Sequence, residues 1–173
     1  MPMSSWRLGS GELVLDRPAG SHIHSGTAKY LPEALISIKS ESLTRLEKEV
    51  DLGRKIGNTT CVKTSHSDEI KYAIRVGDTG VRRTGHSRFV LGRKREPSST
   101  VVVVLEKAAG KSHYVLITAW IGQWAPVEPD DPEATPESWE FWQQHALIWR
   151  SEKTVRASRT NICPWKRIAG GAV

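Results

Sequence analysis

The stretch of sequence that decides the fold begins at Thr100 and reads TVVVVLE, and it is followed from His113 by HYVLITAWI. The first segment is an unbroken apolar run, which is typical of a central strand that is covered on both faces. A turn is expected between them at residues 108–112, where glycine, lysine and serine interrupt the apolar pattern. The two segments therefore predict consecutive strands of a mainly antiparallel sheet.

Three further strands are expected before this pair. Residues 69–76 (EIKYAIRV) place apolar side chains on one side and mostly charged side chains on the other, as a half-exposed strand does. Residues 59–64 (TTCVKT) are rich in β-branched side chains, and the loop at 65–68 predicts a hairpin with the strand that follows. Residues 87–91 complete a sheet of five strands, which we expect to form a meander.

Helices are expected on either side of this sheet in sequence. Apolar residues recur at helical spacing in two series: first Ala28, Leu31, Leu35 and Ile38, and then Leu43, Leu46 and Val50. Gly53 follows the second series and is a good signal for the end of a helix. A third helix begins near Pro136 and carries Trp139 and Trp142 on one side. The sequence therefore predicts the α+β class, with two N-terminal helices packed on a five-stranded sheet and a C-terminal helical extension.

The length of 173 residues fits one domain, which we place at residues 26–150 between a flexible arm (1–25) and a basic, partly disordered tail (151–173). The longest apolar run, Val101–Leu105, is far too short to span a membrane, and the first 17 residues contain no apolar block of a signal peptide. Two cysteines without a CxxC motif favour a reduced, cytoplasmic protein.

The net charge of +6 is the sum of blocks of opposite sign. Residues 71–95 contain eight basic residues and one acid, residues 126–149 contain six acids and no base, and residues 150–173 contain six bases and one acid. A dense, arginine-rich strand region is typical of a surface that holds a nucleic-acid backbone. The expected contacts to nucleic acid are Lys29, Arg82, Arg83, His86, Arg93, Lys94 and Arg95; the alternative is a solvated charged loop.

Several catalytic motifs are incomplete or absent. Residues 110–112 read GKS, but Leu105 stands where a phosphate-binding loop requires its first glycine. There is no GxSxG nucleophile motif and no HExxH metal motif, so we expect neither a cofactor nor a metal site. His22 and His24 are two residues apart in an extended segment, which fits either a metal pair or polar residues of an arm.

Metal-independent RNA cleavage requires a base, an acid and a cation that stabilises the charged phosphorane. The chain offers His24 before the first helical segment, Arg88 and Thr118 on strands, and His145 in the tryptophan-rich helix. Two of these residues also have an ordinary structural explanation. Threonine is common in strands, which accounts for Thr118, and His145 fits a half-buried or capping position. The sequence alone does not show that the four converge.

The order of these residues resembles a known family. A histidine before the helical segment is followed by the arginine-bearing strand SRFV (87–90) and by a strand that ends LITAW (116–120). In this order residues 22–122 are similar to the barnase–EndoU–colicin–RelE group of small ribonuclease toxins. The resemblance implies that His24, Arg88 and Thr118 line an RNA cleft, and that a neutralising antitoxin or immunity protein is a partner. The acidic extension, which carries His145, departs from the family pattern.

Two other functions stay open. A non-catalytic module would use the same basic strands to bind RNA or DNA, with tryptophans interleaved as stacking surfaces. A protein-interaction domain would instead use the acidic segment 126–149, either to cover the basic strand within the chain or to dock a basic partner. Loss of cleavage without loss of binding in His24→Ala or His145→Ala would separate an enzyme from the binding module. The interaction hypothesis predicts instead that deletion of residues 126–149 raises the affinity for nucleic acid.

Overall fold

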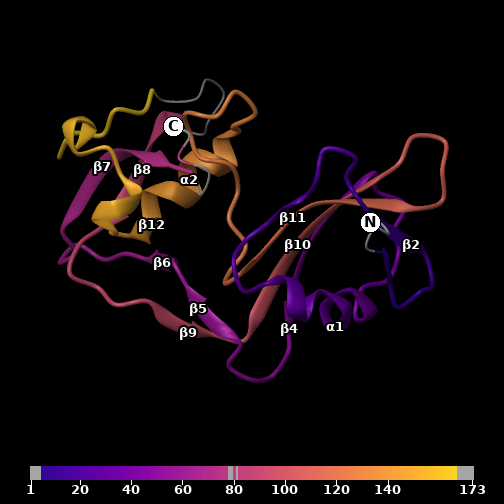
Figure 1. The fold of residues 1–173 in the computed structure, drawn as a ribbon. Helices are drawn as coiled ribbons and strands as arrows, with labels where there is room; N and C mark the ends of the chain where they lie inside the picture. The colour runs from indigo at the N-terminus through magenta and orange to yellow at the C-terminus, as the bar shows by residue number, and fades with distance from the viewer. Residues whose placement is uncertain (1–4, 78–79, 81, 167–173) are drawn as a thin grey trace. The chain divides into compact units, whose positions relative to one another are not determined.

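The computed structural model describes residues 5–77, 80 and 82–166 (Figure 1). The chain divides into two compact units, each made of two segments: Met1–Thr59 with Pro97–Trp124, and Thr60–Glu96 with Ala125–Val173. Strands account for 40% of the structure and helices for 15%. Each unit contains its own sheet, and the described part of the chain has no helix that is long and apolar enough to cross a membrane.

The sheet of the first unit is built around β10, which pairs antiparallel with β11 on one side and with β4 on the other. Two N-terminal strands join β11 in parallel, and β1 pairs antiparallel with β2. The strands are β1 (Ser5–Arg7), β2 (Leu13–Asp16), β3 (His22–Ile23), β4 (Arg45–Asp51), β10 (Thr100–Lys107) and β11 (Tyr114–Ile121).

β10 is buried from Val101 to Leu105, as its unbroken apolar run predicts. Val101, Val103 and Leu105 belong to the main core, together with residues of α1 (Leu31–Ile36), which packs against this strand (Figure 1). Val102 and Val104 alternate with them and are only 0% and 2% exposed. Because successive side chains of a strand point to opposite faces, both faces of β10 are covered.

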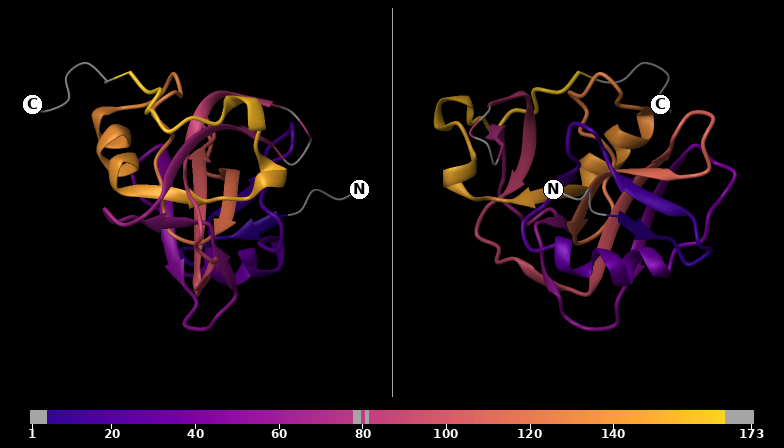
Figure 2. Two further views of the ribbon diagram at one scale, coloured as in Figure 1. Left: turned by 90° about the vertical axis from the view of Figure 1, so that its left-hand side faces the viewer. Right: turned by 45° about the vertical axis from the view of Figure 1, so that its right-hand side comes forward.

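The sheet of the second unit has the strand order β6-β12-β8-β7. β7 and β8 are antiparallel, β12 runs parallel to β8, and β6 closes the other side as an antiparallel neighbour of β12. The elements are β6 (Cys61–Lys63), β7 (Ile70–Val76), β8 (Arg82–Val90), α2 (Pro136–Gln144) and β12 (His145–Ile148). Figure 2 shows α2 as a short orange coil in both views.

The outer edge of β7 is covered by the segment that follows β12. Tyr72 forms a bridge with Thr160, and Arg75 forms one with Thr154. Two 3-10 turns lie in this segment, at Ser151–Lys153 and Arg156–Ser158. Within the expected tail, Thr154 and Thr160 therefore contact β7, and residues 167–173 lie outside the described residues.

The remaining elements are short. β5 (Gly57–Thr59) pairs with β9 (Glu96–Ser98), and a 3-10 turn at Ala28–Tyr30 precedes α1. The expected arm at residues 1–25 contains β1, β2 and β3, so its described part is tied to the first unit's sheet.

The prediction of two N-terminal helices is wrong. Only α1, six residues long, is α-helical there, and the second expected helix is the strand β4. Leu46 and Val50 are four residues apart, a spacing that suits a strand of period two as well as a helix. In β4, Leu46 is buried in the core whereas Glu47 and Glu49 are exposed. Leu43, the first apolar residue of the expected series, is 59% exposed.

The prediction of a single five-stranded sheet is also wrong, because the strands belong to separate sheets. The segment around Cys61–Lys63 does not form a hairpin with β7; it pairs with β12, a strand that the sequence did not indicate. The positions of β7, β10, β11 and α2 are confirmed. α2 begins where expected because Thr135 and Ser138 form a capping box and Pro136 occupies its first turn.

Candidate functional site

One face of the first unit's sheet carries two neighbouring histidines. β3 lies beside β11 in a register that places His22 opposite Thr118 and Ile23 opposite Ala119. Ile23 and Ala119 contribute to the core, and the backbone N–H of His24 extends the ladder by donating to the carbonyl of Ala119 at 3.0 Å. Because strand residues alternate, His22 and Thr118 lie on the face opposite the core.

The two imidazoles are in edge contact, with 4.4 Å between their ring centroids. The ring of His24 also meets the indole of Trp120 edge-on at 6.1 Å. The Thr118 hydroxyl donates to the backbone carbonyl of His22 at 2.7 Å, so its proton fastens β3 to β11. Thr118 thus positions the histidines through the backbone. We call His22, His24, Thr118 and Trp120 the histidine face.

β4, the strand at the opposite edge of this sheet, carries two carboxylates at alternate positions, Glu47 and Glu49. Trp124 binds both carboxylates: its backbone N–H donates to Glu49 and its indole N–H to Glu47, each at 2.8 Å. Glu47 lies opposite Val104, which lies opposite Thr118 on the far side of β10. The histidine face therefore continues over a buried apolar strip to a pair of hydrogen-bonded acids.

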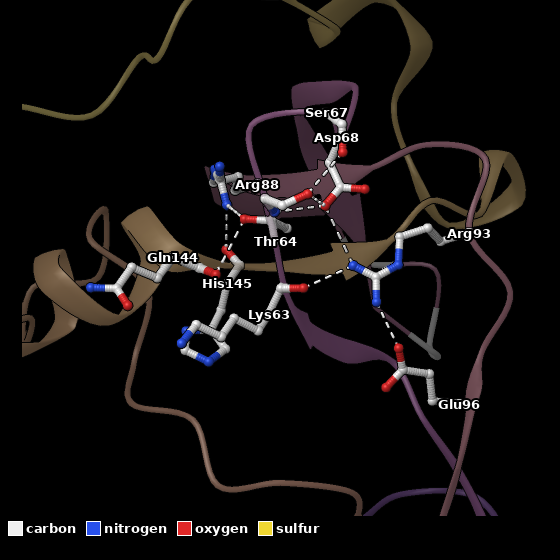
Figure 3. Close-up of polar contacts among 10 residues, drawn as sticks. Lys63, Thr64, Ser67, Asp68, Arg88, Arg93, Glu96, Gln144 and His145 are labelled. Atoms are coloured by element: carbon white, nitrogen blue, oxygen red, sulfur yellow. Dashed lines mark hydrogen bonds and ion pairs between the residues drawn. The ribbon is translucent and has the colours of Figure 1, made fainter.

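In the second unit, Arg88 of β8 contacts β12 and the residue that follows β6 (Figure 3). Its Nη1 atom donates to the hydroxyl of Thr64 and to the backbone carbonyl of His145, each at 2.9 Å. Tyr72 lies opposite Arg88 in the β7–β8 register. Burial and the nearby Cys163 raise the pKa of Tyr72, and Arg88 acts in the opposite direction. Arg88 is therefore engaged in holding the sheet together.

The imidazole of His145 has a different environment from that of Arg88. Its Nδ1 atom lies 2.9 Å from the carbonyl oxygen of Phe141, and the ring stacks on the Phe141 ring at 3.9 Å with 4° between the planes. Figure 3 shows the ring pointing away from Arg88, which reaches only the His145 carbonyl. Lys63 is the register partner of His145. The helix-end position fits the half-buried, capping interpretation of this histidine.

Arg93 is likewise occupied by its own chain. Its Nη1 atom donates to the carbonyl of Lys63 at 2.8 Å and lies 3.5 Å from a carboxylate oxygen of Asp68. Its Nη2 atom pairs with Glu96 at 2.6 Å (Figure 3). Asp68 also accepts the backbone N–H of Ser65 at 2.8 Å, so the same carboxylate shapes the loop before β7.

The acidic segment meets the basic strands within the second unit. One oxygen of Glu128 lies 2.9 Å from the Ser87 hydroxyl, 3.3 Å from Arg75 and 4.0 Å from Arg83. The Arg75 Nε atom donates to the same Ser87 hydroxyl at 2.9 Å. Asp130 accepts the backbone N–H of His86 at 3.0 Å. Glu128 and Asp130 therefore contact β7 and β8 within this unit.

Other expected nucleic-acid contacts are exposed: Arg82, Lys94 and Arg95 in the second unit and Lys29 in the first. The ammonium of Lys29 lies 5.1 Å above the ring of Tyr30. Within the described residues, no group of three or more histidine, cysteine, aspartate or glutamate side chains is arranged to hold a metal ion.

The structure thus brings the four expected catalytic residues together as two pairs. His24 and Thr118 share the histidine face of the first unit, whereas Arg88 meets the backbone of His145 in the second. Sequence reasoning missed the role of His22, although the alternation in HIH (22–24) already placed it on the side of His24. It also missed Thr64, because a loop threonine far from Arg88 in sequence carries no signal of their contact.

Comparison with models of protein families, with curated proteins and with solved structures finds no match to this chain.

Proposed function

We propose that the chain is a metal-independent endoribonuclease whose acid and base are His22 and His24. The observation that carries this proposal is the contact between the two imidazoles, at 4.4 Å, on a sheet face that also presents a tryptophan. Histidine is the side chain best suited to exchange protons near neutral pH, and two of them supply both an acceptor and a donor. The proposal adds His22 to the expected catalytic set, which was His24, Arg88, Thr118 and His145, and it retains only His24 of that set as an acid or base.

The reaction needs no group beyond the substrate and these two rings. The neutral imidazole removes the proton of a ribose 2′-hydroxyl, and the resulting oxygen attacks the adjacent phosphorus. The protonated imidazole gives its proton to the departing 5′-oxygen, so that the P–O5′ bond breaks and a 2′,3′-cyclic phosphate forms. The protonated ring also stabilises the negative charge of the phosphorane.

The other members of the histidine face have supporting roles. Thr118 is a positioning residue, since its hydroxyl fixes the carbonyl of His22 at 2.7 Å. The indole of Trp120 beside His24 is a surface on which a base of single-stranded RNA can stack. Its N–H donates to the carbonyl of Gln123 at 3.1 Å, which restricts the orientation of the ring.

RNA is the proposed substrate because the chain is basic, with a net charge of +6, and because the reaction requires a 2′-hydroxyl. A toxin-type effector that acts on RNA in the cytoplasm would endanger the cell that makes it. We therefore include a neutralising protein partner in the proposal, as the resemblance to ribonuclease toxins implies.

The test is cleavage of an end-labelled, single-stranded RNA by the purified chain in the presence of EDTA. We expect products that end in a cyclic phosphate, and no cleavage of the same sequence as 2′-O-methyl RNA. His22→Ala and His24→Ala should each lower the rate by about 10²-fold or more. His66→Ala is the matched control, because this exposed histidine lies in the loop before β7.

Two results would reject this assignment. One is a wild-type chain that leaves RNA intact under these conditions. The other is cleavage that survives both histidine substitutions, which would place the chemistry elsewhere. Binding of RNA without cleavage would instead support the non-catalytic module.

A further inference from the structure

The carboxylate of Glu128 is bound by three side chains of β7 and β8. One of its oxygens receives the Ser87 hydroxyl at 2.9 Å and lies 3.3 Å from Arg75 and 4.0 Å from Arg83. Ser87 is fully buried, and the Glu128 side chain is only 15% exposed. An arginine pair, a hydroxyl and a buried position together form a site for an anion.

Asp130 supplies a second anionic oxygen, which is bound by the β8 residue next to Ser87. It accepts the backbone N–H of His86 at 3.0 Å, next to Ser87. The close approach depends on Gly85, because a Cβ atom there would lie 2.4 Å from the Cβ of Asp130. β8 therefore holds two anionic oxygens through adjacent residues, one at a side chain and one at a backbone amide.

The acidic segment fills this site imperfectly. The second oxygen of Glu128, Oε1, is buried and has no hydrogen-bond partner among the described residues. A buried anionic oxygen without a donor weakens the interaction that holds it. Pro129, between the two acids, has no N–H to offer a strand, and the backbone forms a turn from Glu128 to Asp131 instead. The segment is therefore held to β8 mainly by side-chain carboxylates.

We propose that Arg75, Arg83, Ser87 and the amide of His86 form a phosphate-binding site for RNA, and that Glu128 and Asp130 occupy it until RNA displaces them. The identity of the ligand rests on the proposed function, but the site does not involve the histidine face. RNA bound here would exchange two intramolecular carboxylates for phosphate groups.

The chemistry of the site favours phosphate as the exchanging anion. A phosphodiester has the same single negative charge as a carboxylate and can accept from a guanidinium, a hydroxyl and a backbone N–H together. Burial and the neighbouring Arg75 both lower the pKa of Arg83. Glu128 and Asp131 act on this pKa in the opposite direction, so the acidic segment offsets the repulsion between the two guanidinium groups within the chain.

The alternative is that Glu128 and Asp130 form permanent structural contacts. The two cases differ in how RNA affinity responds to loss of these carboxylates. The measurement is binding of a fluorescent 2′-O-methyl RNA to the full chain at low and high salt. This RNA cannot undergo the proposed cleavage, so the result does not depend on catalysis.

The test variant is E128Q/D130N, and the matched control is E133Q/E140Q, which removes the same charge from exposed positions of the acidic segment. We expect the test variant to bind RNA about tenfold more tightly than the control does, with a steeper salt dependence. If the two variants bound RNA with equal affinity, the change in net charge alone would explain the result, and the proposal would be overturned. Adding Arg83→Gln to the test variant should cancel its gain.

A second measurement on the wild-type chain covers the case in which E128Q/D130N does not fold. Hydrogen exchange of a peptide that spans residues 127–134 should accelerate when the 2′-O-methyl RNA is added, because displacement breaks the contacts of Glu128 and Asp130. Unchanged exchange at saturating RNA would overturn the proposal. Inorganic phosphate is the companion probe: acceleration by phosphate alone would assign the site to a free anion and not to RNA.

The two proposals can fail separately. A chain that does not cleave RNA but shows the displacement by 2′-O-methyl RNA loses the ribonuclease assignment and keeps this site. A chain that cleaves RNA through His22 and His24 while residues 127–134 remain protected loses only this site.

Discussion

The histidine face of the first unit and the arginine-rich strands of the second use their polar groups in opposite ways. In the first unit, Thr118 donates its proton to a backbone carbonyl, and the two imidazoles contact each other edge-on on the sheet face. In the second, Arg88 and Arg93 are bound to the protein's own hydroxyl, carbonyl and carboxylate groups. We propose the first arrangement as the site of RNA cleavage, whereas Arg88 and Arg93 hold their unit together.

This difference shows why a block of positive charge is a poor guide to a binding surface. The eight basic residues between positions 71 and 95 include Arg75, Arg88 and Arg93, each of which has an internal partner. Some partners come from segments far away in sequence, such as Glu128. In the sequence this block of positive charge contains almost no acid, whereas the fold brings partners to several of its basic side chains.

The largest expected effect is that of removing Arg88, which tests whether this side chain is structural. Arg88→Met leaves the Thr64 hydroxyl and the His145 carbonyl without their charged donor, and should lower the free energy of unfolding by about 2–3 kcal/mol. Arg82→Met is the control, because Arg82 is exposed on the same strand, and should change it by less than about 0.5 kcal/mol. Urea unfolding measures both. Equal stability of the two variants would contradict the structural role of Arg88.

Ser87 gives the next largest effect. Its buried hydroxyl accepts from Arg75 and donates to Glu128, so Ser87→Ala leaves both charged groups with one partner fewer. We expect a loss of about 1–2 kcal/mol in the free energy of unfolding, measured by urea. Ser67→Ala, at an exposed loop position of the same unit, should cost much less. If Ser87→Ala were as stable as the control, the polar cluster would not be holding the acidic segment to β8.

Strands whose apolar residues follow a single pattern could be predicted from the sequence. Strands whose apolar spacing fits both a helix and a strand could not. β7 and β10 match their sequence patterns because strict alternation and a short buried apolar run are both typical of strands. β4 resembles a helix in sequence because Leu46 and Val50 satisfy both periods. The pairing of β6 with β12 could not be predicted at all, since it joins residues more than eighty positions apart and depends on the division into two units.

For a similar reason, the proximity of His24 and Thr118 could not be predicted. Both residues were named as candidates from the chemistry that RNA cleavage requires, without evidence that they converge. Their proximity depends on the parallel pairing of β3 with β11, for which a two-residue strand leaves almost no sequence signal. The pairing of Arg88 with Thr64 is a tertiary contact of the same unpredictable kind.

A smaller effect on stability separates positioning from catalysis on the histidine face. Thr118→Val removes the donor to the His22 carbonyl and should lower the free energy of unfolding by about 1 kcal/mol. Cleavage should fall by about tenfold, because β3 and both imidazoles lose an anchor. Thr118→Ser keeps the hydroxyl and should restore the rate. Failure of serine to restore it would argue that the hydroxyl does not act through His22.

The smallest expected effect is a change in the free energy of unfolding at alkaline pH. It reports on Tyr72, which lies opposite Arg88. Burial, followed by the proximity of Cys163, raises the pKa of Tyr72 above its ordinary value of 10.0. Above that pH the unfolded chain loses the phenolic proton while the folded chain keeps it. The folded state then binds more protons, so the free energy of unfolding decreases as the pH rises through this window.

Tyr72→Phe should remove that decrease, and urea unfolding of both proteins at about pH 9 and about pH 11 measures it. Absorbance titration of the wild type against the variant gives the pKa of Tyr72 directly. A value below the ordinary one would mean that the guanidinium of Arg88 outweighs burial at the phenol. Because the internal partners of Arg88 are an uncharged hydroxyl and an uncharged carbonyl, its charge would then act on the surroundings. Arg88 would return as a candidate phosphate ligand, and the contrast between the two units would fail at this residue.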